Sequence, residues 1–165
     1  TIYEGTTAIQ ANDLVGRKTT RDGGQTAKAI AAQVEATEAE LIAQGGANAA
    51  AVAKKLKAAR LAFIDVVEFI VANGRSNPNA AFAGSVPYLM LAGNLMAGWQ
   101  LARALLVAEA ALAGGACGDF GPTFMQAKIT TARFYADHIL ARAPGVRDAI
   151  VEGAGSVTEL PLEAF

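Results

Sequence analysis

Apolar residues recur every three or four positions over most of this 165-residue chain, and no stretch alternates with a period of two. Such recurrence places apolar side chains on one face of an α-helix, whereas a half-buried strand would alternate. Much of the hydrophobic content (53%) is alanine, the strongest helix former. We therefore expect an all-α fold, a helical bundle of about four main helices joined by short turns.

Glycine and proline mark the expected helix ends. The sequence predicts helices over residues 8–16, 25–44, 48–73, 78–112 (with a break near 83–87), 123–143 and 146–152. The expected caps are Thr7 with Gln10, Thr123 with Gln126, Asn48, and Asn77 followed by Pro78. Pro144 is expected to end the helix before it, and residues 156–165 to form an extended tail.

Residues 80–102 contain no charged side chain. Because the apolar residues lie all round the expected helix, we interpret it as a buried central helix. The stretch also contains polar residues and several glycines, which do not favour a membrane span. A membrane-associated helical protein remains the alternative interpretation of this segment.

The charge balance gives no sign of a nucleic-acid partner, since 14 basic and 15 acidic residues leave a net charge of −1. Nucleic-acid binders usually carry a basic excess for phosphate contacts. The one basic cluster, Lys54, Lys55, Lys57 and Arg60, has the spacing of a solvated helix face.

Cys117 is the single cysteine, so the chain can form no internal disulfide and no cysteine metal cluster. No paired histidines or clustered carboxylates suggest a metal site. We interpret Cys117 as a plain thiol, with a catalytic pair between Cys117 and His138 as the alternative. A reducing, cytoplasmic setting agrees with this cysteine usage.

The first eighteen residues carry the most specific pattern in the chain. Ile2-Tyr3-Glu4-Gly5-Thr6 is followed by Ile9-Gln10 and then by Gly16-Arg17-Lys18. This pattern resembles the acyl-CoA dehydrogenase family. The segments Phe134–Leu140 and Gly153–Val157 are similar to the ending of a longer subgroup of that family, which includes the methylmercaptopropionyl-CoA dehydrogenases.

The resemblance implies a role for each residue of the motif. Glu4 corresponds to the catalytic base, which removes the α-proton of an acyl-CoA while the β-hydrogen leaves as hydride to FAD. A carboxylate suits this task when partial burial raises its pKa towards the working pH. Tyr3 and Gly5 correspond to residues lining the acyl-CoA site, and Thr6 and Gln10 to residues contacting FAD. The alternative for Glu4 is a first-turn acid that stabilises the helix dipole.

The resemblance also implies an organisation and partners. Residues 1–18 would be the catalytic-loop motif and the end of the flavoenzyme core, and residues 19–165 a C-terminal helical bundle domain. The parent would be an FAD-dependent acyl-CoA dehydrogenase of fatty acid metabolism, with electron-transfer flavoprotein as electron acceptor. We expect a homo-oligomer without nucleic-acid or membrane partners, and we expect the 165 residues alone to be inactive. A non-catalytic helical oligomerisation or partner-docking module is the alternative function.

Overall fold

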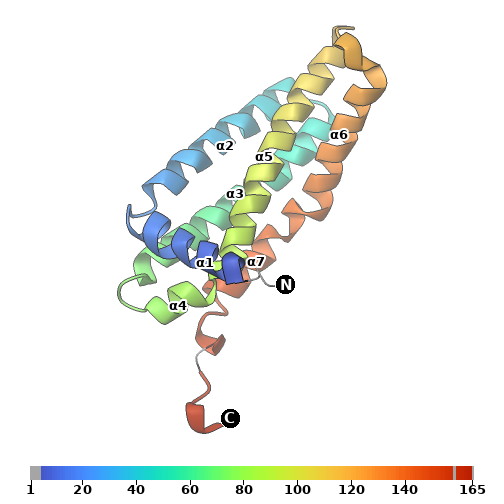
Figure 1. The fold of residues 1–165 in the computed structure, drawn as a ribbon. Coiled ribbons are helices and arrows are strands. Elements are labelled where there is room, and N and C mark those ends of the chain that lie inside the picture. The colour runs from blue at the N-terminus through green and yellow to red at the C-terminus, as the bar shows by residue number, and fades with distance from the viewer. Residues whose placement is uncertain (1–4, 158, 165) are drawn as a thin grey trace.

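The computed structural model describes residues 5–157 and 159–164, and within these ranges the chain contains helices and no strand. The elements are α1 (Gly5–Asp13), the π-helix η1 (Leu14–Thr20), α2 (Gln25–Gln44), α3 (Ala47–Asn73), α4 (Pro78–Ala83), α5 (Ser85–Ala113), α6 (Gly121–His138) and α7 (Ala143–Val151), with short 3-10 turns at 118–120, 140–142, 155–157 and 162–164. The long helices α2, α3, α5 and α6 run alongside one another, and α1 crosses one end of them (Figure 1). The predicted all-α bundle of about four main helices is confirmed.

The central helix is α3, which packs against α2, α5, α6 and α7. The stripe predicted for it is buried throughout: Val52, Leu56, Phe63, Val67 and Ile70. Phe63 also stacks on Tyr88 of α5, with ring centroids 5.9 Å apart. The core therefore lies along α3, where the sequence periodicity placed it.

The interpretation of residues 80–102 as a buried central helix is right for one face only. The buried residues of α5 are spaced three or four apart and face the bundle: Ser85, Tyr88, Leu91, Leu95, Gly98, Ala102, Leu105 and Ala108. The opposite face is exposed although it is also apolar, and only 28% of its most apolar 18-residue window is buried. α5 is long and apolar enough to cross a membrane. Core helices of soluble proteins meet the same criterion of length and composition.

Several helix ends differ from the expected ones because tertiary contacts override local signals. The first helix continues beyond Gly16 to Thr20, since Gly16 packs on Phe82 rather than ending the helix; a Cβ there would lie 3.3 Å from the Phe82 ring. The sixth helix ends at His138, and Pro144 lies in the first turn of α7 instead of only terminating its predecessor.

The expected caps were right in one place and wrong in three. The Asn77 side chain accepts a hydrogen bond from the Ala80 amide and caps α4 as predicted. Both capping boxes fail, because their threonines lie inside helices that begin earlier, at Gly5 and Gly121. Asn48 lies inside α3, whose N-cap is Gly46. The break expected near 83–87 occurs at Gly84, between α4 and α5.

The prediction that Arg60 belongs to a solvated basic face is also wrong. Its guanidinium is buried between α3 and α2, where Nε and Nη2 donate to the two carboxylate oxygens of Glu38 at 2.8 and 2.9 Å. Nη2 also donates to Glu35 at 3.0 Å. Lys54 and Lys57 are exposed as expected. A buried bidentate pair thus joins α2 to α3.

Candidate functional site

The motif residues fall at the start of α1, which carries them at one end of the bundle. Tyr3 and Glu4 lie outside the described residues, and Gly5 is the first residue of α1. Thr6 and Gln10 are both exposed. Because they are four residues apart on one helix, their side chains share a face. The structure therefore places Thr6 and Gln10 on one exposed face of α1.

The segment after the motif is held firmly on the bundle. Ala11, Val15 and Thr19, spaced four apart, are buried against the other helices. The chain stays helical through Asp13 (φ −63°, ψ −43°) and changes there from the α to the π hydrogen-bond pattern. The Thr20 hydroxyl donates to the carbonyl of Val15, five residues earlier, at 2.8 Å. One continuous helix thus connects the motif to the bundle.

A buried hydroxyl pair fixes the end of this helix against α5. The hydroxyl oxygens of Thr19 and Tyr88 lie 2.9 Å apart in a hydrogen bond between residues 69 positions apart in the sequence. Burial raises the pKa of the Tyr88 phenol, and the hydrogen bond to Thr19 opposes the increase. Tyr88 therefore stays neutral at physiological pH and acts here as a structural hydrogen-bonding group.

The turn between η1 and α2 depends on Asp22. Its carboxylate accepts hydrogen bonds from the backbone amides of Gly24, at 2.9 Å, and Thr26, at 3.0 Å. Hydrogen bonds from Thr26 lower the pKa of the Asp22 carboxyl below its usual value. Gly24 adopts φ +77°, and a Cβ there would lie 2.7 Å from Val67. The carboxylate and the glycine together start α2 close to α3.

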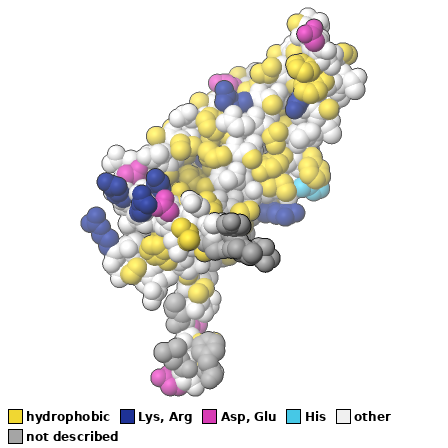
Figure 2. Space-filling model, in the orientation of Figure 1, with side chains coloured by type: hydrophobic (Ala, Val, Ile, Leu, Met, Phe, Trp, Pro, Cys, Tyr) yellow, Lys and Arg dark blue, Asp and Glu magenta, His cyan; other side chains and the backbone are white. Residues whose placement is uncertain are grey.

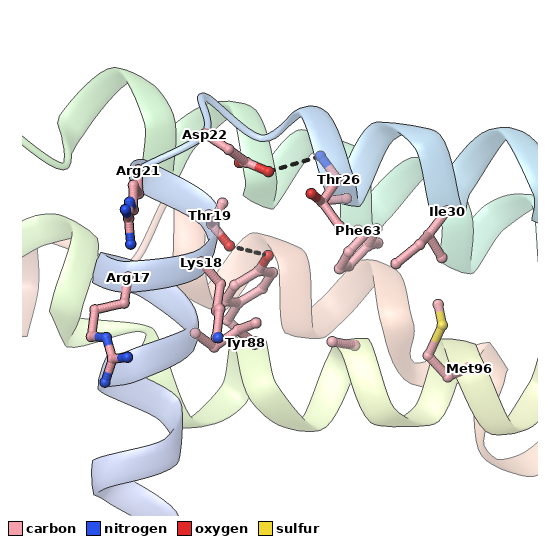
Figure 3. A pocket seen from close by; sticks show the side chains of 13 residues that line it. Arg17, Lys18, Thr19, Arg21, Asp22, Thr26, Ile30, Phe63, Tyr88 and Met96 are labelled. Carbon is pink, nitrogen blue, oxygen red and sulfur yellow. Dashed lines mark hydrogen bonds between the residues drawn. The ribbon is translucent and has the colours of Figure 1, made fainter.

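A cavity of about 530 Å³ opens where η1, α2, α3 and α5 meet (Figure 3). Its apolar wall consists of Leu14, Ala27, Ile30, Phe63, Ala92 and Met96. Its polar lining consists of Arg17, Lys18, Thr19, Arg21, Asp22, Thr26 and Tyr88. The volume lies within the range of roughly 300–1,000 Å³ that small-molecule sites occupy.

Sequence patterns did not reveal this cavity. Its lining extends from Leu14 to Met96, so no local motif contains it. The only related signal was the basic pair Arg17-Lys18, which the sequence explains equally well as a helix end.

The alternative of a catalytic pair between Cys117 and His138 is wrong. The two residues flank opposite ends of α6, whose 18 residues span about 27 Å. The Cys117 thiol faces the carbonyl of Ala111 at 3.8 Å, and the imidazole of His138 packs on Phe134. Among residues 5–157 and 159–164, no three His, Cys, Asp or Glu side chains are grouped so as to hold a metal ion.

Comparison with known proteins identifies the family. Residues 26–161 match the family described as acetyl-CoA dehydrogenase C-terminal like. The chain is 49% identical over 156 residues to a 3-methylmercaptopropionyl-CoA dehydrogenase of Ruegeria pomeroyi, covering 94% of this chain and 26% of that protein. It is 32% identical to the broad-specificity linear acyl-CoA dehydrogenase FadE5 of Mycobacterium tuberculosis (99% and 27%) and 29% identical to a butyryl-CoA dehydrogenase of Syntrophomonas wolfei (99% and 26%).

The chain therefore spans about a quarter of the length of the curated relatives it matches. The family match starts at α2 and covers the whole bundle, whereas the motif at residues 2–10 precedes it. These matches confirm the relation that the motif predicted, and the chain belongs to the acetyl-CoA dehydrogenase C-terminal-like family, the helical C-terminal region of acyl-CoA dehydrogenases.

Proposed function

We propose that this chain is the C-terminal portion of an FAD-dependent acyl-CoA dehydrogenase, which oxidises an acyl-CoA thioester to the α,β-unsaturated product. The observation that carries the proposal is the motif Tyr3-Glu4-Gly5-Thr6, whose described residues open a helix that is anchored on a bundle of the matching family. Each of the three relatives is named as an acyl-CoA dehydrogenase.

Glu4 is the proposed base that removes the α-proton of the thioester. A carboxylate can do this when its surroundings raise its pKa towards the working pH. Gly5 has no side chain, so the backbone beside the base can approach the substrate closely. Tyr3 is the proposed second contact to the acyl-CoA. The flavin, when bound, supplies the acceptor for the hydride from the β-carbon.

The described residues fit only the edge of an FAD site. Thr6 and Gln10 present two polar side chains on one exposed face at the N-terminus of α1, where backbone amides favour anionic groups. Two side chains cannot bury a dinucleotide, and cofactor sites bury most of their ligand. We therefore propose that other parts of a larger protein hold most of the FAD, and that residues 1–165 alone have no dehydrogenase activity.

The proposed setting follows from the same assignment. The reduced flavin would pass its electrons to an electron-transfer flavoprotein, and the parent would act as a homo-oligomer in the cytoplasm. The single half-buried Cys117 agrees with a reducing compartment. The boundary between a catalytic segment at 1–18 and a bundle domain at 19–165 stays a prediction, although η1 runs across it without a break.

The test is Glu4→Gln in the full-length parent enzyme. The amide is nearly isosteric with the carboxylate, so FAD content should stay at the wild-type level while α-proton abstraction falls by about 100-fold or more. Glu40→Gln, on an exposed position of α2, is the matched control and should leave turnover unchanged. Turnover of the Glu4 variant within about threefold of wild type would place the base elsewhere.

The second candidate is a non-catalytic helical module for oligomerisation or partner docking. The exposed apolar face of α5 favours it, because contiguous apolar surface often marks an interface. A parent protein that contains no flavin and oxidises no acyl-CoA, yet loses its assembly when this region is deleted, would support this candidate over the enzyme.

A further inference from the structure

The cavity between η1, α2, α3 and α5 has an apolar end and a basic end. Ile30 and Met96 lie at one end in Figure 3, and Arg17, Lys18 and Arg21 lie at the other. The apolar wall is formed by side chains from four elements, η1, α2, α3 and α5. Met96 adds an adaptable thioether side chain to this wall, suited to ligands of varying shape. The interior therefore favours an apolar group.

The basic end carries charge that the described part of the chain does not neutralise. Arg17 forms an ion pair with Asp13 at 3.1 Å. The side chains of Arg17, Lys18 and Arg21 are exposed. Lys18 and Arg21 make no ion pair within residues 5–157 and 159–164. Figure 2 shows Lys and Arg side chains gathered at the α1 end of the molecule, beside hydrophobic surface. Two cations thus remain available to a ligand at the cavity mouth.

The acidic and hydroxyl groups of the cavity are already satisfied. Asp22, the single acid in the lining, accepts hydrogen bonds from the amides of Gly24 and Thr26. The hydroxyls of Thr19 and Tyr88 bond to each other. Neither group needs a ligand, so polar recognition in this cavity falls to the basic residues at its mouth.

We propose that this cavity binds an alkyl carboxylate, with the carboxylate at Lys18 and Arg21 and the alkyl chain directed towards Ile30 and Met96. The charge at the mouth selects an anion, and a carboxylate matches the guanidinium fork of Arg21. Burying the alkyl chain removes its surface from water and supplies most of the affinity. This binding site is independent of the dehydrogenase reaction proposed above.

The experiment is titration calorimetry of the 165-residue chain with decanoate, below the concentration at which decanoate forms micelles. We expect saturable binding of one molecule per chain. Decanol, with the same chain and no charge, should bind about tenfold more weakly. Acetate, which has the charge without the chain, should bind more than about a thousandfold more weakly and give no measurable heat, because eight buried methylenes contribute most of the affinity. Equal affinity for decanol and decanoate would overturn the role of the basic residues.

Two pairs of variants locate the site. Lys18→Glu with Arg21→Glu should weaken decanoate binding by about tenfold or more, whereas Lys54→Glu with Lys57→Glu makes the same charge change on an exposed part of α3 and should leave it within about twofold. Equal losses in both pairs would show a general charge effect and overturn the proposal.

A second comparison tests the apolar wall directly. Ala92→Phe fills the cavity and should abolish binding, while Ala97→Phe on the exposed face of α5 should not. Circular dichroism of each variant verifies that the helices are retained, and binding that survives a folded Ala92→Phe would place the ligand elsewhere. Sedimentation velocity decides between the ligand and a second copy of the chain, because a copy seated in the cavity would give dimers that decanoate does not dissociate, which would also overturn the proposal.

Discussion

Removing Arg60 should destabilise the chain far more than removing an ordinary surface arginine. Its side chain is 9% exposed and that of its partner Glu38 5%, and two hydrogen bonds of 2.8 and 2.9 Å join them. The hydrogen bond to Glu38 raises the pKa of Arg60 above its usual value, so the guanidinium keeps its charge in the buried site. Arg60→Met leaves the Glu38 carboxylate buried without a cation, which typically costs about 3–5 kcal/mol.

The structure predicts unequal effects for the two partners. Glu38→Met should cost less than Arg60→Met, because Glu35 still accepts from the guanidinium at 3.0 Å and reaches solvent with 64% of its side chain exposed. Glu35→Gln should cost under about 1 kcal/mol, as for an exposed ion pair. The double variant Glu38→Met with Arg60→Met removes both charges and fills similar volume, so its stability should return close to wild type.

Urea unfolding followed by far-ultraviolet circular dichroism gives the free energy of unfolding of each variant, and an unchanged slope with urea verifies that the unfolding reaction is the same. The double-mutant cycle then isolates the interaction between Arg60 and Glu38. Additive losses in the double variant, or a loss below about 1 kcal/mol for Arg60→Met, would show that the pair behaves as a surface ion pair and would refute the reasoning.

Two further predictions concern α5. Gly98→Ala should destabilise the chain by about 1 kcal/mol, because the new Cβ would lie 2.7 Å from a methyl carbon of buried Leu140, whereas Gly93→Ala meets nothing within 4 Å and should stabilise the helix by up to about 1 kcal/mol in the same urea assay. The stability that the raised pKa of Tyr88 contributes is fully present below the pKa of the unfolded phenol, near pH 10, and is lost as the pH rises through the folded pKa. In Tyr88→Phe, the free energy of unfolding should fall less steeply with pH in the alkaline range, and a fall as steep as that of wild type would contradict the burial argument. At neutral pH the free energy of unfolding of this variant should be lower by about 1 kcal/mol, because the hydrogen bond to Thr19 is lost.

The helices could be predicted because their signals are local. The bounds of α2 agree with the predicted 25–44, since glycines at both ends stop the helix and the apolar stripe lies between them. The predicted stripe of α3 is the core of the molecule. Periodicity also gave the number of main helices, because each long run corresponds to one helix of the bundle.

The differences arise where a residue's partner lies far away in the sequence. Gly16 and Pro144 have the local character of helix ends, yet Gly16 lies within a helix against Phe82 and Pro144 lies in the first turn of a new helix. Arg60 resembles its exposed lysine neighbours until α2 brings Glu38 beside it. Spacing along one helix cannot supply such information, since it depends on which helices become neighbours.

One part of the candidate site could be predicted from the sequence and the other part could not. The motif around Glu4 could be recognised because its residues are contiguous. It predicts a base, a substrate contact and a cofactor contact without knowledge of the fold. The cavity could not be recognised, because it exists only once α5 passes the end of η1. A contiguous motif thus predicts chemistry, whereas a binding cavity requires the packed structure.

The sequence of α5 agrees with three environments, and a single charge separates a helix with one buried face from the other two. A core helix, a membrane span and a helix with a docking face can all be apolar on every side, and in this bundle only one face is buried. Ala97 is exposed near the middle of α5, and Leu95 is fully buried two residues earlier. Ala97→Lys should change the free energy of unfolding by less than about 0.5 kcal/mol in detergent-free buffer, whereas Leu95→Lys should cost more than about 4 kcal/mol because it buries an unpaired ammonium group. A membrane span would penalise the two substitutions alike, since both positions would lie in hydrocarbon. Equal and severe losses would therefore exclude the bundle as the working state of α5.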